Sequence, residues 1–507
     1  MQELVRTTIG EIFRSTVAAC PNAPAVSEGG ESITYQQLYS RVCAISRRLL
    51  AMGYGHGSHI AIFAENGGAM LSLLLAIWSI GAVAVPICSC YTEKELIGCL
   101  NVVGAELLVT DRPVLPMAGL AILKMDGRWF ELSEDILPQS KVEEAMKKVK
   151  PEDEDTILFT SGSMDSAKPV ITTHYSRVNT LIAQAAGIGI TSRDRVCSVL
   201  PMHHCFSITA TLLPAIYAGA QICFPRDRHT LSIIETIEKY QCTVLNAVPT
   251  LFSALLRRIR ETGCRLSSLR IGLIGGSAYP SSIVEDIERA TGMLLLPSLG
   301  QTEATAGITI GNICDPIDVR SNTVGRFFPN IEGSIREGGK EMPYGKAGEI
   351  CVRGYCVMKG YYGSPEETAA AIDRDGWLRT GDIGWLDGED RLHYVGRKKE
   401  MIIRGGENIS PAEIENALKN IPGVTDACVV GVPDKHFTEE ICALIAQNAD
   451  VNEDYLRAAL KDSLAYYKIP RYFLFVDVLP VMSNGKADRR QISKMAMQYI
   501  ETVNDEV

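Results

Sequence analysis

The stretch RLHYVGRKKEMIIRGG, residues 391–406, marks the place where the pattern of the sequence changes. It contains two strand-like segments, which are separated by the charged run RKKE at residues 397–400. Domain boundaries commonly fall in polar connections of this kind. We therefore predict a domain boundary in this run, between a large domain over residues 1–396 and a small domain over 400–507.

Upstream of this stretch, short apolar runs alternate with amphipathic segments. The runs predicted to be strands include SHIAIFA (58–64), AELLVT (105–110), DRVCSVLP (194–201) and RIGLIGGS (270–277). The intervening segments, such as LFSALLRRIRETG (251–263), have the apolar spacing of helices. Strands separated by helices predict parallel sheets that helices cover on both faces.

The pattern becomes one of shorter strands and turns after about Gly325, as in GEICVRG at residues 348–354. A small α+β unit follows Lys399. At 507 residues the chain is too long for one compact core. The predicted fold class is α/β, with a large N-terminal domain of parallel-rich sheets flanked by helices and a small α+β C-terminal domain.

Composition excludes several classes of protein. Hydrophobic residues make up 46% and charged residues 22% of the chain, which is the balance of a globular protein. The net charge of −10 argues against a general affinity for nucleic acid. The fifteen cysteines form no C-x-x-C pair, and the N-terminus has no basic region followed by an apolar core. We therefore expect reduced thiols, no signal peptide and a cytoplasmic location.

One segment has the composition of a membrane span. Residues Ala69 to Ile87 carry no charge, but Gly81 divides them. The part before the glycine suits a buried helix, and AVAVPI after it suits a buried strand. The sequence therefore predicts a helix followed by a strand, and no membrane span.

The stretch FTSGSMDSAKPVITTH, residues 159–174, begins as a phosphate-binding loop does. Gly162 and Lys168 have the separation of a Walker loop, but Ala167 replaces its second glycine and Pro169 its magnesium-binding hydroxyl. Taken alone, this stretch could equally be an ordinary surface turn with one lysine.

Four other short stretches could carry chemistry: LGQTEA (299–304), Asp382 in GWLRTGD, Arg397 in YVGRKKE, and Lys486 in SNGKADRR. Each alone could be a turn or a solvated charge. Together and in this order they resemble the adenylate-forming superfamily of acyl- and aryl-CoA synthetases, peptide-synthetase adenylation domains and luciferases. The resemblance covers nearly the whole chain and is strongest over residues 348–415.

The resemblance implies an ATP site with a glycine-rich phosphate loop of the pattern TSG[ST]TGxPKG. Thr160, Ser161, Gly162, Ser163 and Lys168 match this pattern, whereas Asp165, Ala167 and Pro169 depart from it. An aspartate there would repel phosphate oxygens unless it points outward. The departures leave open how strongly ATP binds.

The other nucleotide contacts are also implied by the resemblance. Gly276, Ser277 and Ala278 would line the adenine pocket. Leu299, Gly300 and Gln301 would also bind ATP or AMP, and Leu299 replaces a usual aromatic residue that would stack on adenine. Thr302 would reach the α-phosphate, and Glu303 would hold magnesium. Asp382 would bind the ribose hydroxyls with the support of Arg397. Residues 397–399 would form a hinge between the domains, with Lys399 as the hinge residue. The same resemblance implies a small β-barrel-like part in the large domain and a mobile C-terminal domain.

The acyl pocket is implied by the stretch PMHHCF, which matches the superfamily pattern P-L-F-H-x-x-G and places His204 beside the acyl group. We expect His204, Asn246, Val248 and Ala304 to line this pocket. No aspartate stands nearby to pair with an α-amine, so an amino-acid substrate would carry an unpaired charge.

The resemblance further implies a reaction in two steps. The substrate carboxylate attacks the α-phosphate of ATP while Lys486, Lys168 and magnesium stabilise charge. The small domain then rotates about Lys399 and removes Lys486 from the site. Gly405 and Gly406 would leave space for the pantetheine arm of coenzyme A, whose thiol displaces AMP.

We therefore expect an AMP-forming acid–thiol ligase, most simply an acyl-CoA synthetase for medium- or long-chain fatty acids or for aryl acids. Its cofactors would be ATP and Mg²⁺, with coenzyme A as co-substrate. The chain ends soon after Lys486, so the thiol would arrive on coenzyme A or on a separate carrier protein. Two alternatives stay open: a ligase for an acyl carrier protein, and a non-catalytic ligand-binding homologue with a degenerate phosphate loop.

Overall fold

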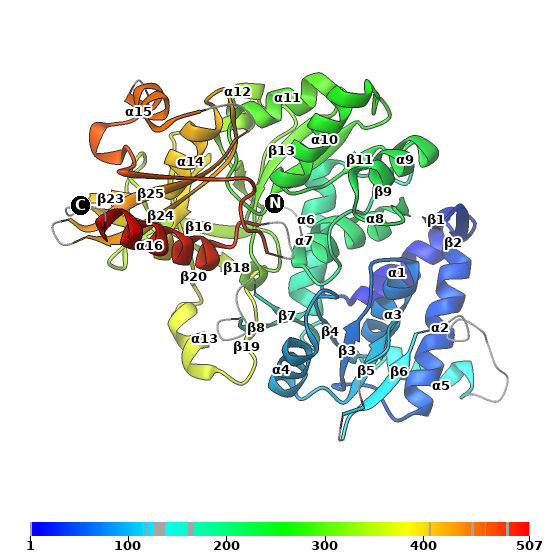
Figure 1. The fold of residues 1–507 in the computed structure, drawn as a ribbon. Helices are drawn as coiled ribbons and strands as arrows, with labels where there is room; N and C mark the ends of the chain where they lie inside the picture. The colour runs from blue at the N-terminus through cyan, green and yellow to red at the C-terminus, as the bar shows by residue number, and fades with distance from the viewer. Residues whose placement is uncertain are drawn as a thin grey trace.

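The computed structural model describes residues 3–114, 116–117, 119–125, 137–160, 167–404, 407–434, 437–447, 451–461, 463–482 and 486–505. Most of residues 1–396 forms two large sheets with helices packed around them (Figure 1). The helices are α1 (Ile9–Ala19), α2 (Tyr35–Ala51), α3 (Gly68–Ser79), α4 (Glu93–Val103), α5 (Gln139–Met146), α6 (His174–Ile188), α7 (Cys205–Ser207), α8 (Leu213–Ala218), α9 (Thr230–Tyr240), α10 (Pro249–Thr262), α11 (Ser282–Thr291), α12 (Ile317–Asn322) and α13 (Pro365–Ala371).

The first sheet has seven strands, and its centre is parallel. Its order is β19 (Gly360–Tyr361), β8 (Pro169–Thr173), β7 (Glu154–Phe159), β4 (Val83–Pro86), β3 (His59–Phe63), β5 (Leu107–Thr110) and β6 (Ala121–Lys124). The strands β7 and β8 pair antiparallel, and the segment that joins them is the predicted phosphate loop. The loop therefore leaves the sheet at the end of β7.

The second sheet has nine strands and is also parallel at its centre. Its order is β15 (Arg326–Phe327), β14 (Thr309–Ile310), β13 (Leu294–Leu299), β12 (Ile271–Gly275), β11 (Val244–Leu245), β9 (Arg195–Cys197), β10 (Gln221–Phe224), β1 (Pro24–Glu28) and β2 (Glu31–Thr34). The loops that leave β12 and β13 carry the predicted adenine and α-phosphate residues. Because these strands are parallel neighbours, both loops emerge at the same edge.

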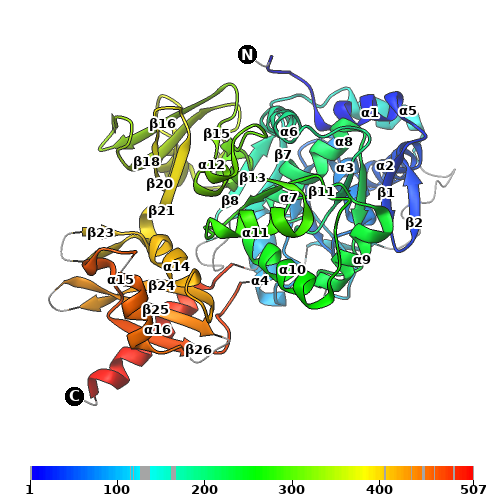
Figure 2. The same ribbon diagram turned by 90° about the horizontal axis from the view of Figure 1, so that it is seen from above.

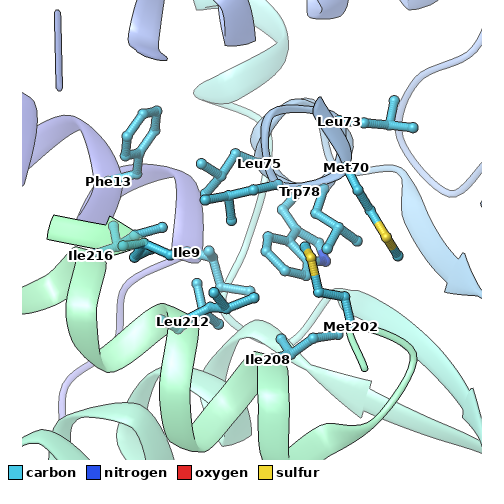
Figure 3. Packing of buried hydrophobic residues seen from close by; sticks show 14 of the residues in the cluster. Ile9, Phe13, Met70, Leu73, Leu75, Trp78, Met202, Ile208, Leu212 and Ile216 are labelled. Atoms are coloured by element: carbon cyan, nitrogen blue, oxygen red, sulfur yellow. The ribbon is translucent and has the colours of Figure 1, made fainter. Parts of the chain in front are cut away.

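The prediction for residues 69–87 is confirmed. Helix α3 ends at Ser79, Gly81 has a positive φ of 75°, and β4 follows. The helix is buried along its length and packs against α1 and α2. Figure 3 shows Trp78 of α3 among apolar residues from distant segments, including Ile9, Phe13 and Leu212. No helix in the described part of the chain is long and apolar enough to cross a membrane.

A buried ion pair ties β7 to α6 within this core. Arg177 and Asp155 form a salt bridge, and both side chains are fully buried. The Arg177 guanidinium also donates to the hydroxyl groups of Thr209 (2.6 Å) and Thr172 (2.5 Å). The hydroxyl of Thr172 donates in turn to Asp155 at 2.7 Å. These contacts satisfy the charges that burial would otherwise make costly.

The strands after Gly325 are antiparallel, as predicted. They form an open five-stranded sheet in the order β17 (Lys340–Glu341), β16 (Ile331–Glu337), β18 (Gly348–Gly354), β20 (Leu378–Leu386) and β21 (Leu392–Arg397). This sheet occupies the place of the predicted barrel-like part, with β17 and β21 at its edges. A short 3₁₀ turn at Lys398–Glu400 leads away from β21.

The residues after 400 form a separate α+β unit, seen in orange and red beside the larger part in Figure 2. Its strands are β23 (Glu407–Ile409), β22 (Ile402–Arg404), β25 (Thr438–Gln447), β24 (Val424–Asp434) and β26 (Tyr472–Val476). Its helices are α14 (Pro411–Lys419), α15 (Glu453–Lys461) and α16 (Arg489–Asp505). It has its own apolar core around Ile414, Val429 and Phe473. The predicted fold class is confirmed: an α/β chain with a large N-terminal part and a small C-terminal part.

Candidate active site

A large cleft of about 3080 Å³ lies between the two parts of the chain. Its walls come from the loops after β12 and β13, from β20 and β21, and from the start of α16. Most of the predicted site residues line it, namely Thr160, Lys168, His204, Val248, Gly276, Ser277, Ala278, Leu299, Gly300, Gln301, Thr302, Glu303, Asp382, Arg397, Lys399 and Lys486. The fold therefore brings together residues that are more than three hundred positions apart in the sequence.

The base of the predicted phosphate loop is closed by two hydrogen bonds. The backbone N–H of Thr160 donates to the carbonyl of Lys168 at 3.0 Å, and the N–H of Lys168 donates to the Thr160 hydroxyl at 2.9 Å. The ammonium of Lys168 lies 3.2 Å from Glu367 and over the ring of Tyr361 at 4.8 Å. Ser161, Gly162 and Ser163, as well as Asp165, lie outside the described residues.

Glu303 follows β13 on a tight turn. Its carboxylate accepts a hydrogen bond from the hydroxyl of Tyr361 at 3.0 Å, which fixes the orientation of the carboxylate. A Cβ atom at Gly300 would come within 2.2 Å of the carbonyl of Ala306, so this turn requires glycine. The hydroxyl of Thr302 lies 3.7 Å from the thiol of Cys205. The turn thus presents one carboxylate and one hydroxyl to the cleft.

Sequence reasoning missed Tyr361, although it lies in the stretch of strongest resemblance. Tyr361 belongs to β19, which pairs with β8 directly after the phosphate loop. It contacts both Lys168, predicted for the phosphate loop, and Glu303, predicted to hold magnesium. The repeated aromatic residues in KGYYG were the signal that could have indicated a ring at this place.

Asp382 and Arg397 face each other across the paired strands β20 and β21. The Nε atom of Arg397 lies 2.9 Å from Oδ1 of Asp382, and the Asp382 side chain is 1% exposed. The other oxygen, Oδ2, is buried and has no hydrogen-bond partner among the described residues. Burial raises the pKa of Asp382 to about 6 against the opposing effect of Arg397, and the negative charges of Glu303 and Glu400 add to the rise.

An unpartnered buried acceptor is costly, so Oδ2 is suited to a ligand that brings a donor. A hydroxyl group is such a donor, and one carboxylate can accept from two adjacent hydroxyls. Asp382 therefore has the environment that the predicted ribose contact needs.

Lys486 reaches this cleft from the small C-terminal part. Burial lowers the pKa of Lys486, and the positive charge of Arg397 lowers it further, whereas Cys205, Asp382 and Glu400 act in the opposite direction. Lys486 lines the cleft together with Asp382 and Arg397, among the residues predicted to bind the nucleotide.

The adjoining start of α16 is held by Arg489, another residue that sequence reasoning missed. Its Nε atom lies 3.1 Å from Glu400, and its Nη2 atom lies 2.6 Å from Glu415. These ion pairs connect the segment of Lys486 to the turn at Lys398–Glu400 and to α14. The signal in the sequence was the arginine pair that ends SNGKADRR.

Two adjacent imidazoles line the acyl side of the cleft. The rings of His203 and His204 are 4.3 Å apart, and the Nε2 atoms of both are buried without a hydrogen-bond partner among the described residues. Burial lowers the pKa of His203 to about 3, and it holds the pKa of His204 well below its usual value. Both imidazoles are therefore neutral at physiological pH.

Two residues predicted for the acyl pocket are placed elsewhere. The amide of Asn246 donates to the carbonyl of Ala210 (2.9 Å) and to Thr211 (3.1 Å), and its oxygen accepts from the N–H of Leu273 (2.9 Å). Ala304 is fully buried in an apolar cluster. Neither is among the described residues that line the cleft, because the contacts of each are made within the protein.

The residues predicted for the thiol route and for the hinge are not contradicted by the structure. Gly405 and Gly406 lie outside the described residues. Lys399 is exposed within the 3₁₀ turn at Lys398–Glu400, and it lines the cleft. It thus lies between β21 of the antiparallel sheet and β22 of the C-terminal sheet.

Comparisons with known proteins show the family to which the chain belongs. The family model for AMP-binding enzymes matches residues 13–362, and the model for the AMP-binding enzyme C-terminal domain matches residues 413–486. A putative acyl-CoA synthetase, YngI, of Bacillus subtilis is 34% identical, and the match covers 98% of each chain. A feruloyl-CoA synthase of an Amycolatopsis species is 32% identical over 94% of this chain and 96% of its own.

Solved structures show the same architecture. The o-succinylbenzoate coenzyme A synthetase of Bacillus subtilis, in complex with ATP and a magnesium ion, superimposes with a TM-score of 0.85. It is 26% identical, and the match covers 96% of this chain and 99% of that one. Family models, relatives and fold agree: the chain belongs to the AMP-binding enzyme family and is an adenylate-forming enzyme of the acyl-CoA synthetase type.

Proposed function

We propose that the protein uses ATP to activate a carboxylic acid as its acyl-adenylate and then transfers the acyl group to the thiol of coenzyme A. The observation that carries this proposal is that Lys486, from the C-terminal part, lines the same cleft as the ion-paired Asp382 and Arg397. A non-catalytic nucleotide-binding protein would need the ribose contacts but not the lysine. The transfer to the thiol of coenzyme A is inferred from the relatives, which include a feruloyl-CoA synthase and a medium-chain acyl-CoA ligase.

In the first step, an oxygen of the substrate carboxylate forms a bond to the α-phosphorus of ATP, and the bond to pyrophosphate breaks. Lys486 would lie between the two negatively charged reactants and reduce their repulsion. Lys168, held at the base of the phosphate loop, would receive the departing pyrophosphate. Asp382 and Arg397 would hold the ribose, so that positioning and charge stabilisation supply the catalysis.

The turn after β13 fits a magnesium ion bound together with nucleotide. Magnesium is usually held by one or two carboxylates and by substrate phosphates. Glu303 supplies a carboxylate that Tyr361 orients, and the hydroxyl of Thr302 lies next to it in sequence. The ion would neutralise charge on the phosphate oxygens when it is bound.

In the second step, the C-terminal part would turn about Lys399 and carry Lys486 away from the adenylate. We propose the domain limits 1–396 and 400–507 on either side of the hinge at 397–399. Strand β21 pairs with the antiparallel sheet, whereas β22 pairs within the C-terminal sheet, which supports a hinge between them. Gly405 and Gly406 would then admit the thiol, which attacks the acyl carbonyl and displaces AMP.

The identity of the substrate acid is also part of this proposal. Medium- or long-chain fatty acids and aryl acids are the candidates, since Val248 and Leu251 give the acyl side of the cleft an apolar surface. We also propose a cytoplasmic location, because none of the fifteen cysteines, all of which the structure describes, takes part in a disulfide.

The test is pyrophosphate release across a panel of carboxylic acids, with and without coenzyme A, followed by detection of the thioester. We expect release that requires both acid and ATP, and a thioester that requires coenzyme A. Thioester formation only on a carrier protein would replace coenzyme A by a carrier as the acceptor. AMP binding without pyrophosphate release from any acid would refute catalysis and leave a ligand-binding protein.

A further inference from the structure

A π-helical turn follows the segment that lines the acyl side of the cleft. It spans Ile208–Leu212 and joins α7 to α8. The N–H of Leu213 donates to the carbonyl of Ile208, which is five residues earlier rather than the four of an α-helix. The second residue of α8, Pro214, explains the wider turn, because proline has no N–H to donate and its ring would clash with the carbonyl four residues earlier. Turns of this kind are frequent at functional sites.

Asn246 supplies the donor that Pro214 lacks. The carbonyl four residues before Pro214 belongs to Ala210, and Nδ2 of Asn246 donates to it at 2.9 Å. The oxygen of the same amide accepts from the N–H of Leu273 in β12 at 2.9 Å. A carbonyl can only accept and an N–H can only donate, so these two partners fix the orientation of the amide. Asn246 is buried, and loss of its amide would leave polar groups unpaired in the interior.

The same amide is connected to the surface of the cleft through one hydroxyl. Nδ2 of Asn246 also donates to Oγ1 of Thr211 at 3.1 Å, and this hydroxyl donates to the carbonyl of Phe206 at 3.1 Å. Phe206 lines the cleft together with His204 and Cys205, and these three residues form the acyl wall. The position of the acyl wall therefore depends on the π-helical turn and on the asparagine that holds it.

The π-helical turn is also anchored to the core. Figure 3 shows Ile208 and Leu212 in the apolar cluster that contains Trp78 of α3. The hydroxyl of Thr209 accepts a hydrogen bond from the buried Arg177 at 2.6 Å. Apolar packing and this hydrogen bond thus fix the turn to the core, while Asn246 connects it to β12.

We propose that Asn246 is a positioning residue that holds the acyl wall through Ala210 and Thr211 and thereby determines which acids the enzyme prefers. The inference rests on the proposed function and adds a determinant of its acid specificity. Asn246 does not line the cleft, so among the described residues it acts through the acyl wall rather than on the substrate. A small displacement of such a wall changes the fit of the acid, and displacements of about 1 Å can cost about a hundredfold in rate.

The first test is the rate of pyrophosphate release without coenzyme A in the wild type and in Asn246→Leu. The acids are saturated monocarboxylic acids of increasing chain length and a set of aryl acids. Asn246→Leu should lower kcat/KM for the preferred acid by on the order of tenfold to a hundredfold. It should also change the order of preference among the acids, while the KM for ATP should change little.

Variants of Thr211 separate the acyl wall from β12, because Thr211 contacts Asn246 and Phe206 but leaves the bond to Leu273 intact. Thr211→Val removes the hydroxyl and should shift the preference among acids in the same direction as Asn246→Leu. Thr211→Ser keeps the hydroxyl and should keep the wild-type preference. The Asn246→Leu/Thr211→Val double variant should lose no more than Asn246→Leu alone, since both changes break one chain of hydrogen bonds.

Asn179→Leu is the matched control for a loss of stability. Asn179 of α6 is also buried, and its amide donates to the carbonyls of Val5 (3.0 Å) and Tyr175 (2.9 Å) and accepts from the N–H of Val5 (2.9 Å). It is not among the described residues that line the cleft. Its replacement should lower the melting temperature, as that of Asn246 does, but it should leave the preference among acids unchanged.

Three results would overturn the inference. One is a folded Asn246→Leu variant with the wild-type order of preference; if that variant does not fold, a wild-type preference in Thr211→Val has the same meaning. Another is an equal shift in Asn179→Leu, which would assign the effect to stability. The third is a rise in the KM for ATP as large as the loss with the acid, which would assign the effect to β12. Absence of pyrophosphate release from the wild type with every acid is a different outcome, which refutes the proposed function itself.

Discussion

Replacement of Lys486 by alanine tests the proposed division of the reaction into two conformations. In the structure, the lysine lies in the cleft beside Arg397 and Asp382, where burial lowers its pKa. In the adenylation step it would bring positive charge to two anions as they approach each other. Loss of one such contact in a desolvated site costs about 3 to 4 kcal/mol, or roughly a few hundredfold in rate.

Lys486→Ala should therefore reduce pyrophosphate release from ATP and acid by about two to three orders of magnitude. Supplied with preformed acyl-adenylate and coenzyme A, the same variant should form thioester at close to the wild-type rate. Lys494→Ala is the matched control, because Lys494 is an exposed lysine of α16 that lines the same cleft. It should leave adenylation nearly unchanged.

The result that refutes this reasoning is an equal loss in both half-reactions. It would mean that Lys486 stays beside the adenylate during thiol attack, or that the variant is misfolded. Circular dichroism and the melting temperature separate these two causes. Retention of adenylation in Lys486→Ala would refute the role of the lysine itself.

Four further changes test other parts of the site and the core. Asp165→Gly should strengthen ATP binding or speed adenylation, since it removes a negative charge from the phosphate loop. Calorimetry would measure the ATP affinity, and pyrophosphate release would measure the adenylation rate. If both are unchanged or lower in the variant, Asp165 does not face phosphate. Gly406→Leu should slow thioester formation but not adenylation, as stopped assays of the two half-reactions would show, whereas equal losses would indicate misfolding. AMP affinity should fall as the pH drops through about 6, because protonation removes the negative charge of Asp382 that accepts the ribose hydroxyls. Titration calorimetry of AMP binding from pH 8 to pH 5 should show this fall. The Asp382→Asn variant should bind AMP weakly, with little pH dependence. Arg177→Met should lower the free energy of unfolding by about 3 to 5 kcal/mol, because it leaves the buried carboxylate of Asp155 unpaired. Denaturant unfolding measures this loss of stability. Recovery of stability in the Arg177→Met/Asp155→Asn double variant would show that the unpaired charge causes the loss.

The sequence by itself determined the elements whose cause is local. The step from helix to strand across Gly81 depends on an apolar run and a glycine with positive φ, and both can be recognised in one short segment. The antiparallel strands after Gly325 and the separate C-terminal unit follow from alternating patterns and turns in the same way. The motifs also indicated the family, because their residue types and order are specific.

Only the tertiary structure decided which of these residues meet. Asn246 has the polarity expected of a pocket residue, yet its hydrogen bonds hold three backbone segments together, which no local pattern reveals. Tyr361 contacts Glu303 because β19 happens to pair with β8, and that pairing joins segments almost two hundred residues apart. The contacts of Asn246 and Tyr361 depend on how sheets and helices pack in three dimensions, whereas a pattern in the sequence reports only on neighbours along the chain.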